Sequence, residues 1–83
     1  MDAAGAKSFL QFLLENISED FSQLEIAEIN DEQGVLFQLS VPENQMGQIL
    51  GKGGQTAKSL RQLLRVFAAC HGTGRISLKI SAK

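Results

Sequence analysis

The sequence has no tryptophan and no tyrosine, and it contains only one cysteine, one histidine and one proline. The lone cysteine, Cys70, excludes an internal disulfide and a metal site built from several cysteines, and it is typical of a reducing compartment. His71 follows it, and consecutive residues of a helix point about 100° apart, so the two side chains do not face one common ligand. We therefore interpret Cys70 as a buried thiol and His71 as a histidine at a helix end.

Acidic residues are absent from residue 44 to the C-terminus. All nine lie in residues 1–43, where Lys7 is the one base. The second half of the chain instead carries these basic side chains: Lys52, Lys58, Arg61, Arg65, Arg75, Lys79 and Lys83. The net charge of −1 and the pI of about 5.7 conceal this division. Because electrostatic potential is set by nearby charges, we expect the second half to attract a polyanion.

Long hydrophobic runs are also missing. No apolar stretch approaches the roughly 20 residues that a membrane-spanning helix needs, so we expect a cytoplasmic protein without membrane contact. A chain of this length buries only about 60% of its unfolded surface, and a cavity for a large organic cofactor would remove much of its core. We therefore expect one domain, residues 1–83, that is not an enzyme and has no cofactor or metal. Residues 1–5 are a candidate flexible end.

Apolar periodicity predicts the first half of that domain. Apolar residues recur on one face of residues 6–17, which predicts an amphipathic helix. Phe12 lies off that face, where it is either partly buried in the domain or in contact with a second chain. Residues 23–30 predict a strand with a bulge or an early end, and residues 35–41 alternate without a fault. The turn residues between them indicate an antiparallel hairpin.

Two helices and a last strand follow. Pro42 is expected at the first helical position, and the helix should end at Gly51, where glycines permit positive φ. A second helix is predicted from Gln55 to Cys70, and residues 76–81 alternate as a final strand. The order αββααβ predicts an α+β fold, in which a three-stranded sheet is covered on one face by three helices.

The segment Gly51–Gly54 between the two predicted helices is the main functional signal. A P-loop is excluded because Gly53 stands where that motif needs serine or threonine. A dinucleotide-binding fingerprint needs an acidic residue about 20 residues downstream, and the sequence has none there. The remaining motif is G-x-x-G between two helices, whose backbone clamps a single nucleic-acid strand. The segment satisfies it, and it leads into a helix N-terminus, which attracts anions.

Residues 47–65 carry a family resemblance. The stretch GQILGKGGQTAK, followed by LRQLLR, resembles a bacterial type II KH domain, and the whole chain is similar to small stand-alone KH proteins of the KhpA type. The resemblance implies RNA binding with little sequence selectivity and a role as a post-transcriptional regulator or RNA chaperone. It also implies a homodimer, and pairing with a larger KH-domain protein in controlling cell elongation and division.

We expect a single RNA strand to lie across the glycine segment, with its phosphates bound by N–H groups around Gly53, Gly54 and Gln55. Lys52 and Lys58 would add charge, and an apolar edge with the second strand would support the bases. The expected contact residues are Met46, Ile49, Leu50, Gly51, Lys52, Gly53, Gly54, Gln55, Lys58 and Arg61. Arg65 is interpreted as part of a solvated helix face. Because tyrosine and tryptophan are absent, base stacking is largely missing and binding should be weak.

Two positions depart from the family pattern. Ala57 stands where relatives often carry a bulky aliphatic residue. Less apolar volume should therefore lie at the floor of the groove that faces the bases, or in the packing of the helix. Gln55 stands where a basic residue is frequent, which removes one phosphate contact. The alternative function is a protein-interaction module on a KH scaffold, which dimerises or docks to a second KH protein through Phe12 or the helix around Gly47. The acidic first half would then meet a basic surface.

Overall fold

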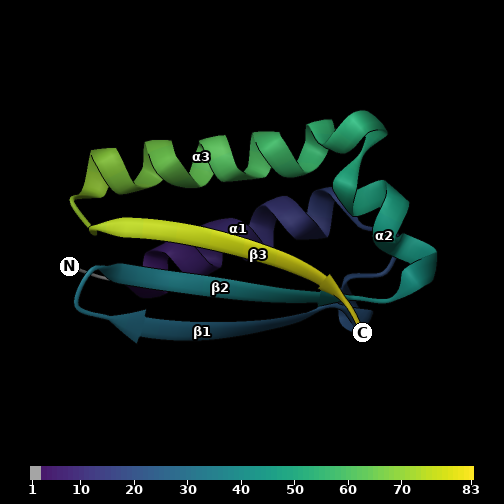
Figure 1. The fold of residues 1–83 in the computed structure, drawn as a ribbon, viewed down its shortest axis with the longest axis horizontal. Coiled ribbons are helices and arrows are strands. Elements are labelled where there is room, and N and C mark those ends of the chain that lie inside the picture. The colour runs from purple at the N-terminus through teal and green to yellow at the C-terminus, as the bar shows by residue number, and fades with distance from the viewer. Residues whose placement is uncertain (1–2) are drawn as a thin grey trace.

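A computed structural model describes residues 3–83 and shows a three-stranded sheet with helices on one of its faces (Figure 1). The elements are α1 (Ala3–Ile17), a 3-10 turn η1 (Phe21–Gln23), β1 (Glu25–Asp31), β2 (Gly34–Val41), α2 (Glu43–Leu50), a 3-10 turn η2 (Lys52–Gly54), α3 (Gln55–His71) and β3 (Arg75–Ala82). The predicted α+β class and the order αββααβ are confirmed. Within the described part, no helix has both the length and the apolar character to cross a membrane.

Helix α1 begins at Ala3, so residues 3–5 are helical, and the flexible end expected at residues 1–5 stays a prediction. Residues 1 and 2 lie outside the described part of the chain. Alanine has the highest helix propensity, which favours the early start. Gly5 lies inside this first stretch, and a Cβ built on it would be 3.4 Å from the Phe67 ring of α3. The missing side chain therefore lets α1 lie close to α3.

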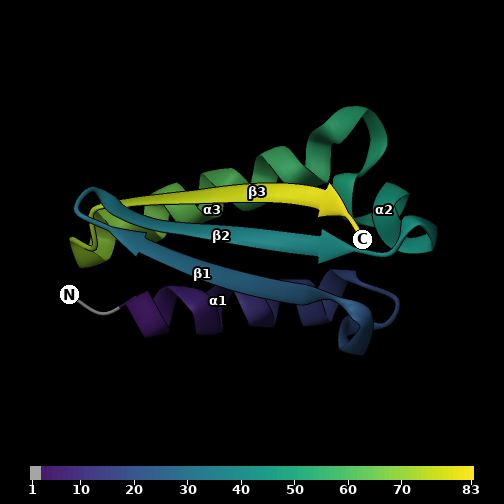
Figure 2. The same cartoon turned by 60° about the horizontal axis from the view of Figure 1, so that its bottom comes forward.

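Strand β2 is the central strand of the sheet (Figure 2). It pairs antiparallel with β1 from Glu25 opposite Ser40 to Asp31 opposite Gly34, which confirms the predicted hairpin. The register has no interruption, so the expected bulge or early end is wrong. The apparent phase slip arises because Ile29 points to the uncovered face of the sheet, where it is 46% exposed. On its other side, β2 pairs in parallel with β3.

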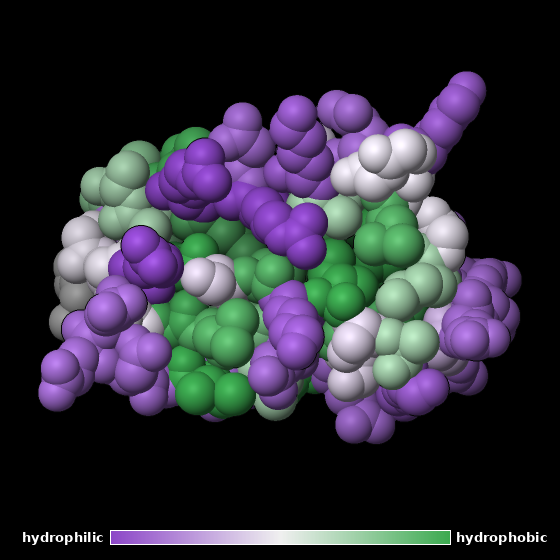
Figure 3. Space-filling model, in the orientation of Figure 1, coloured by the Kyte–Doolittle hydropathy of each residue, from purple (hydrophilic) through white to green (hydrophobic). Residues whose placement is uncertain are grey.

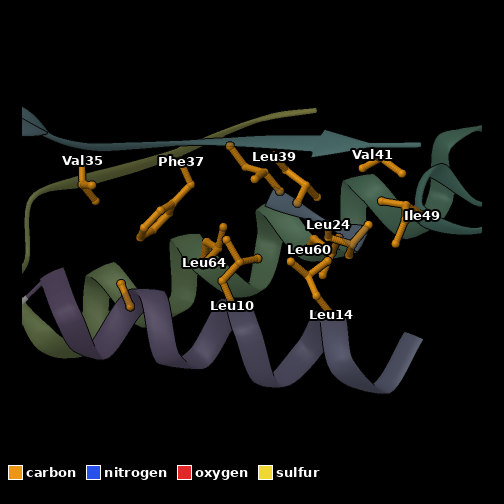
Figure 4. Close-up of a cluster of buried hydrophobic side chains, with 12 residues drawn as sticks. Leu10, Leu14, Leu24, Val35, Phe37, Leu39, Val41, Ile49, Leu60 and Leu64 are labelled. Carbon is orange, nitrogen blue, oxygen red and sulfur yellow. The ribbon is translucent and has the colours of Figure 1, made fainter. Parts of the chain in front are cut away.

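The hydrophobic core fills the space between the sheet and the two long helices (Figure 4). Alternate side chains of β2 point inward, and the helices supply leucines at helical spacing. The central members of the cluster are Leu10, Leu14, Val35, Phe37, Leu39, Val41, Leu60 and Leu64. Complete burial of one such side chain is worth about 1.5–3 kcal/mol, so this cluster fixes α1 and α3 on the sheet.

Helix α2 is attached to the core by a buried glutamine. Pro42 precedes the helix in an extended conformation, so its expected place as the first helical residue is wrong by one position. Gln45 is 1% exposed; its Oε1 accepts the Asp20 N–H at 3.1 Å, and its Nε2 donates to the Asp20 carbonyl at 3.0 Å. A buried amide that is paired at both ends is stabilising, whereas an unpaired one is costly. This contact fixes the position of α2 and of the glycine turn that follows it.

Candidate nucleic-acid interface

The chain turns sharply at Gly51, where α2 ends. The Gly51 N–H donates to the Gly47 carbonyl at 2.8 Å, and Gly51 has φ 77° and ψ 173°, a conformation that is essentially restricted to glycine. A Cβ built on Gly51 would be 2.7 Å from Thr56 Cβ and 2.8 Å from the Thr56 nitrogen. Only glycine therefore fits between the two helices, and α2 and α3 do not continue as one rod.

The N–H groups of the turn η2 divide into paired and unpaired ones. The Gly54 N–H donates to the Gly51 carbonyl at 3.1 Å, and the Gln55 N–H donates to the Lys52 carbonyl. Two of the three amides expected to bind phosphate are thus already occupied in this structure. The N–H groups of Lys52 and Gly53 are the first of the turn and have no acceptor within it. The amides available to an anion therefore lie one residue earlier than the sequence suggested.

The front of the turn is open. Lys52 and Gly53 are exposed. A Cβ built on Gly53 or on Gly54 would have no neighbour within 4 Å, although both residues adopt left-handed conformations with φ of 63° and 77°. The backbone here can be approached closely by another chain. Lys52 places a positive charge at the tip, directly before the N-terminus of the 17-residue helix α3.

The expected apolar edge beside the turn is only partly available. Met46 and Leu50 are half-buried, but Ile49 is fully buried in the core and offers no surface to a base. Ala57 is 3% exposed, so its small side chain affects the packing of α3 on the core. Lys58 is exposed on the first turns of α3, close in sequence to Lys52.

The edge strand beside this site is β3, whereas the second strand, which we expect to support the bases, is the central strand of the sheet. Strand β2 lies between β1 and β3, so β3 is the edge strand on the α3 side. Arg61 reaches this edge from α3, because its Nε donates to the Leu78 carbonyl at 3.3 Å. The sequence contained a signal for this strand order. Strands β2 and β3 are connected through helices, as parallel strands are, and β1 of the hairpin pairs with the other side of β2.

The two charge types occupy opposite sides of the fold. Basic residues other than Lys7 of α1 lie in η2, along α3 and on β3 or just after it, whereas the acidic residues lie mainly on β1, on α1 and in the loops next to them. In the part of the chain that is described, the one ion pair joins Lys83 Nζ to Glu25 Oε2 at 3.1 Å. Hydrophilic side chains form a row along the upper edge of the molecule, above apolar surface (Figure 3). The basic side of the fold is the side that carries the glycine turn.

Cys70 and His71 do not form a site. Cys70 is exposed, so the prediction of a buried thiol is wrong. The His71 ring stacks on Phe67 with centroids 4.0 Å apart, and Phe67 in turn stacks on Phe9 of α1 at 5.4 Å. These rings contribute to the packing of the two helices. Among residues 3–83, no group of three or more histidine, cysteine, aspartate or glutamate side chains could hold a metal ion.

The antiparallel hairpin, the parallel third strand and the G-x-x-G turn between α2 and α3 together define a type II KH domain. Within this class, the family described as "KhpA/KhpB, KH domain" matches residues 7–80, and the chain belongs to that family. The chain is 34% identical over 74 residues to "RNA-binding protein KhpA" of Chlamydia pneumoniae, covering 89% of this chain and 94% of that protein. It is 33% identical over 58 residues to the protein of the same description from Thermotoga maritima, covering 70% and 77%.

Proposed function

We propose that this chain binds single-stranded RNA at the turn η2. The observation that carries the proposal is the exposed pair of N–H groups at Lys52 and Gly53, which have no acceptor in the turn and lie beside the Lys52 charge. Such groups at a helix N-terminus bind phosphate readily, and a G-x-x-G turn between helices clamps a nucleic-acid backbone. The relatives described as RNA-binding proteins support RNA as the ligand.

Recognition of the backbone, with little selectivity among bases, follows from the placement of the aromatic residues. Phe37 is fully buried, and Phe9 and Phe67 stack between the helices, so they offer no platform at the turn. Phe12 is exposed but lies on α1, and Phe21 in η1 is partly buried against the core. Base stacking, worth about 1–3 kcal/mol per base in other single-strand binders, is therefore missing here. Weak binding to many RNAs suits a post-transcriptional regulator or an RNA chaperone.

Binding should depend on salt as expected for a few phosphate contacts. We expect three phosphate contacts, from Lys52, Lys58 and Arg61. Each neutralised phosphate of a single strand contributes about 0.7 to the salt dependence. A plot of the logarithm of the association constant against the logarithm of salt concentration should therefore have a slope of roughly −2. Fluorescence anisotropy with a labelled oligouridylate over a salt series measures this slope. The variant Lys52→Gln should reduce its size by about 0.7. A slope near zero would contradict the proposal.

A second candidate function, self-association, is favoured by the exposure of Phe12. Phe12, Leu63 and Val66 are 62%, 41% and 58% exposed. Phe12 is three residues from Phe9, which stacks on α3, and α1 and α3 run in opposite directions (Figure 1). Phe12 and Leu63 therefore both lie at the outer seam of the two helices.

We propose that a second copy of the chain covers this seam in a two-fold dimer. A two-fold axis parallel to the helices places α1 of each copy over α3 of the other, which brings the exposed apolar residues Phe12, Leu63 and Val66 of the two copies together. Pairing with a larger KH-domain protein through the same seam would compete with this dimer.

The variant Phe12→Ser should convert the dimer into a monomer, because it removes the most exposed apolar side chain of the seam. Size-exclusion chromatography with light scattering measures the mass, which should fall from twice the chain mass to the 9.0 kDa of a single chain. The control is Ile29→Ser, which removes an exposed apolar residue from the uncovered sheet face and should leave the dimer intact. A monomeric parent protein, or equal effects of the two substitutions, would argue against this interface.

A further inference from the structure

Strand β1 is the edge of the sheet that lies away from β3 (Figure 2). It pairs with β2 on one side, and the direction of its backbone groups follows from β2. The N–H groups of Arg75 and Lys83 donate to the carbonyls of Gln33 and Val41 at 3.0 Å, so odd-numbered residues in 33–41 turn their backbone groups toward β3. The even-numbered residues of β2 therefore turn theirs toward β1.

The register then decides which backbone groups of β1 are free. Even-numbered residues of β2 lie opposite odd-numbered residues of β1, as in the pair of Ile29 with Leu36, so the odd-numbered residues of β1 bond within the sheet. Ile26, Glu28 and Asn30 turn their N–H and C=O groups outward instead. Within residues 3–83, no hydrogen bond from a loop, a helix end or a side chain reaches these groups. Such an edge is a template for pairing with another chain.

Acidic side chains follow this edge at intervals of three residues. Strand β1 carries Glu25, Glu28 and Asp31 and no base. Glu28 lies opposite Phe37 and so points to the helix-covered face, whereas Glu25 and Asp31 point to the uncovered face. Among residues 3–83, only Glu25 of these three acids has a basic partner, Lys83 at 3.1 Å. The carboxylates of Glu28 and Asp31 therefore lack a counter-charge in the described part of the chain.

These acids oppose the pairing of β1 with β1 of a second copy. A two-fold axis through the middle of the strand would place Glu28 of one copy opposite Glu28 of the other, and Glu25 opposite Asp31. Like charges directly opposite each other are destabilising, and charges in an edge strand protect proteins against association through their edges. A strand that carries bases at the same spacing would instead form favourable pairs along the whole edge.

We propose that β1 binds an extended segment of another protein, rich in lysine or arginine, which adds to the sheet as a fourth, antiparallel strand. Its backbone bonds to Ile26, Glu28 and Asn30 from about 4.8 Å away. Its bases meet the acids of β1, and its apolar residues lie beside Ala27 and Ile29, which are exposed on the uncovered face. The orientation is antiparallel because this pairing is slightly more stable per residue than the parallel one. The site is separate from the turn η2 and does not depend on RNA binding there.

The probe is an acetylated and amidated peptide, Lys-Thr-Val-Lys-Val-Thr-Lys, whose bases match the spacing of the acids. At about ten times its dissociation constant, it should slow hydrogen exchange at the amides of Ile26, Glu28 and Asn30 by about tenfold, because they are then exposed only in the free protein. Exchange at Ala27 and Ile29, whose amides already bond to β2, should change by less than about twofold. Nuclear magnetic resonance of ¹⁵N-labelled protein measures these rates.

Methylated peptides separate strand pairing from attraction between charges. A methyl group on the nitrogen of the fourth residue removes the N–H that bonds to the Glu28 carbonyl, and it should weaken binding by about tenfold. The same group on the third residue, whose N–H points away from β1, should weaken binding by less than about threefold. Both peptides keep the charge and composition of the probe. Equal losses would overturn the proposal, because charge alone would then hold the peptide.

A pair of protein variants tests the place of the site. Glu28→Lys should weaken the probe by about tenfold, whereas Glu15→Lys, the same change in charge on α1, should weaken it by less than about threefold. Equal effects would contradict binding at β1. The proposal is also wrong if rising protein concentration alone protects the outward amides of β1, since a second copy would then be the occupant. Protection of these amides by oligouridylate and not by the peptide would assign the edge to RNA and would equally overturn it.

Discussion

Replacing both Lys52 and Gly53 with aspartate should lower the affinity for a single-stranded RNA by roughly a hundredfold, or about 2.8 kcal/mol. Lys52→Asp reverses the charge at the tip of the turn, and Gly53→Asp places a second carboxylate beside the two unpaired N–H groups. Both changes repel a phosphate at the position where it would bind. Fluorescence anisotropy with an oligouridylate measures the loss.

The matched control replaces the same residues with neutral side chains, Lys52→Gln and Gly53→Asn. Asparagine tolerates the left-handed conformation of Gly53, and open space lies in front of it. The control should lose less than about tenfold in affinity, since it removes one phosphate contact without adding repulsion. Both variants should melt within a few degrees of the parent protein. Unchanged RNA affinity in the aspartate variant would favour the protein-interaction function.

Gly51→Ala should destabilise the protein by about 3 kcal/mol, the largest effect expected for any glycine of the turn. Its φ and ψ of 77° and 173° are unfavourable for alanine, and the new Cβ would overlap Thr56, including its backbone nitrogen. The backbone at the N-terminus of α3 would have to move. For a chain of this size the melting temperature should fall by roughly 15 °C, as measured by circular dichroism.

Gly53→Ala separates the cost of the positive φ from the cost of the overlap with Thr56. Gly53 also has a positive φ, but a Cβ built on it meets nothing within 4 Å. Alanine there has only the left-handed backbone cost of about 1–2 kcal/mol. Urea unfolding of both variants gives the difference in free energy. Equal losses at the two positions would mean that the contact with Thr56 does not matter.

Local pattern was sufficient to predict the elements and the fold class. The alternation along β2 and the helical spacing on α1 and α3 indicate which side chains face the core. Only a few arrangements of the helices and the sheet bury all of these apolar faces at once. The G-x-x-G turn was also readable, because Gly51, Gly53 and Gly54 all have positive φ, which glycine adopts without strain. These features depend on residues that are neighbours in sequence.

Features that depend on distant residues were not readable in the same way. Ile49 is apolar and adjacent to the turn, and only the packing of α2 shows that it is buried. Which amides of the turn are free depends on carbonyl positions set by Gly51. Ile29 disturbed the strand pattern because the sheet leaves one face uncovered. Arg65 and Arg75 come together because β3 forms the edge beside α3.

The pairing of Gln45 with Asp20 has a consequence for how the protein tolerates sequence change. The contact uses the side chain at position 45 but only main-chain atoms at position 20. Any residue at position 20 except proline, which has no N–H, offers the same main-chain atoms to this contact, whereas the side chain at position 45 is specific to it. A smaller residue at 45 would let α2 and the turn adopt many orientations, and the entropy of restoring one of them would weaken RNA binding, although residue 45 contacts no nucleotide.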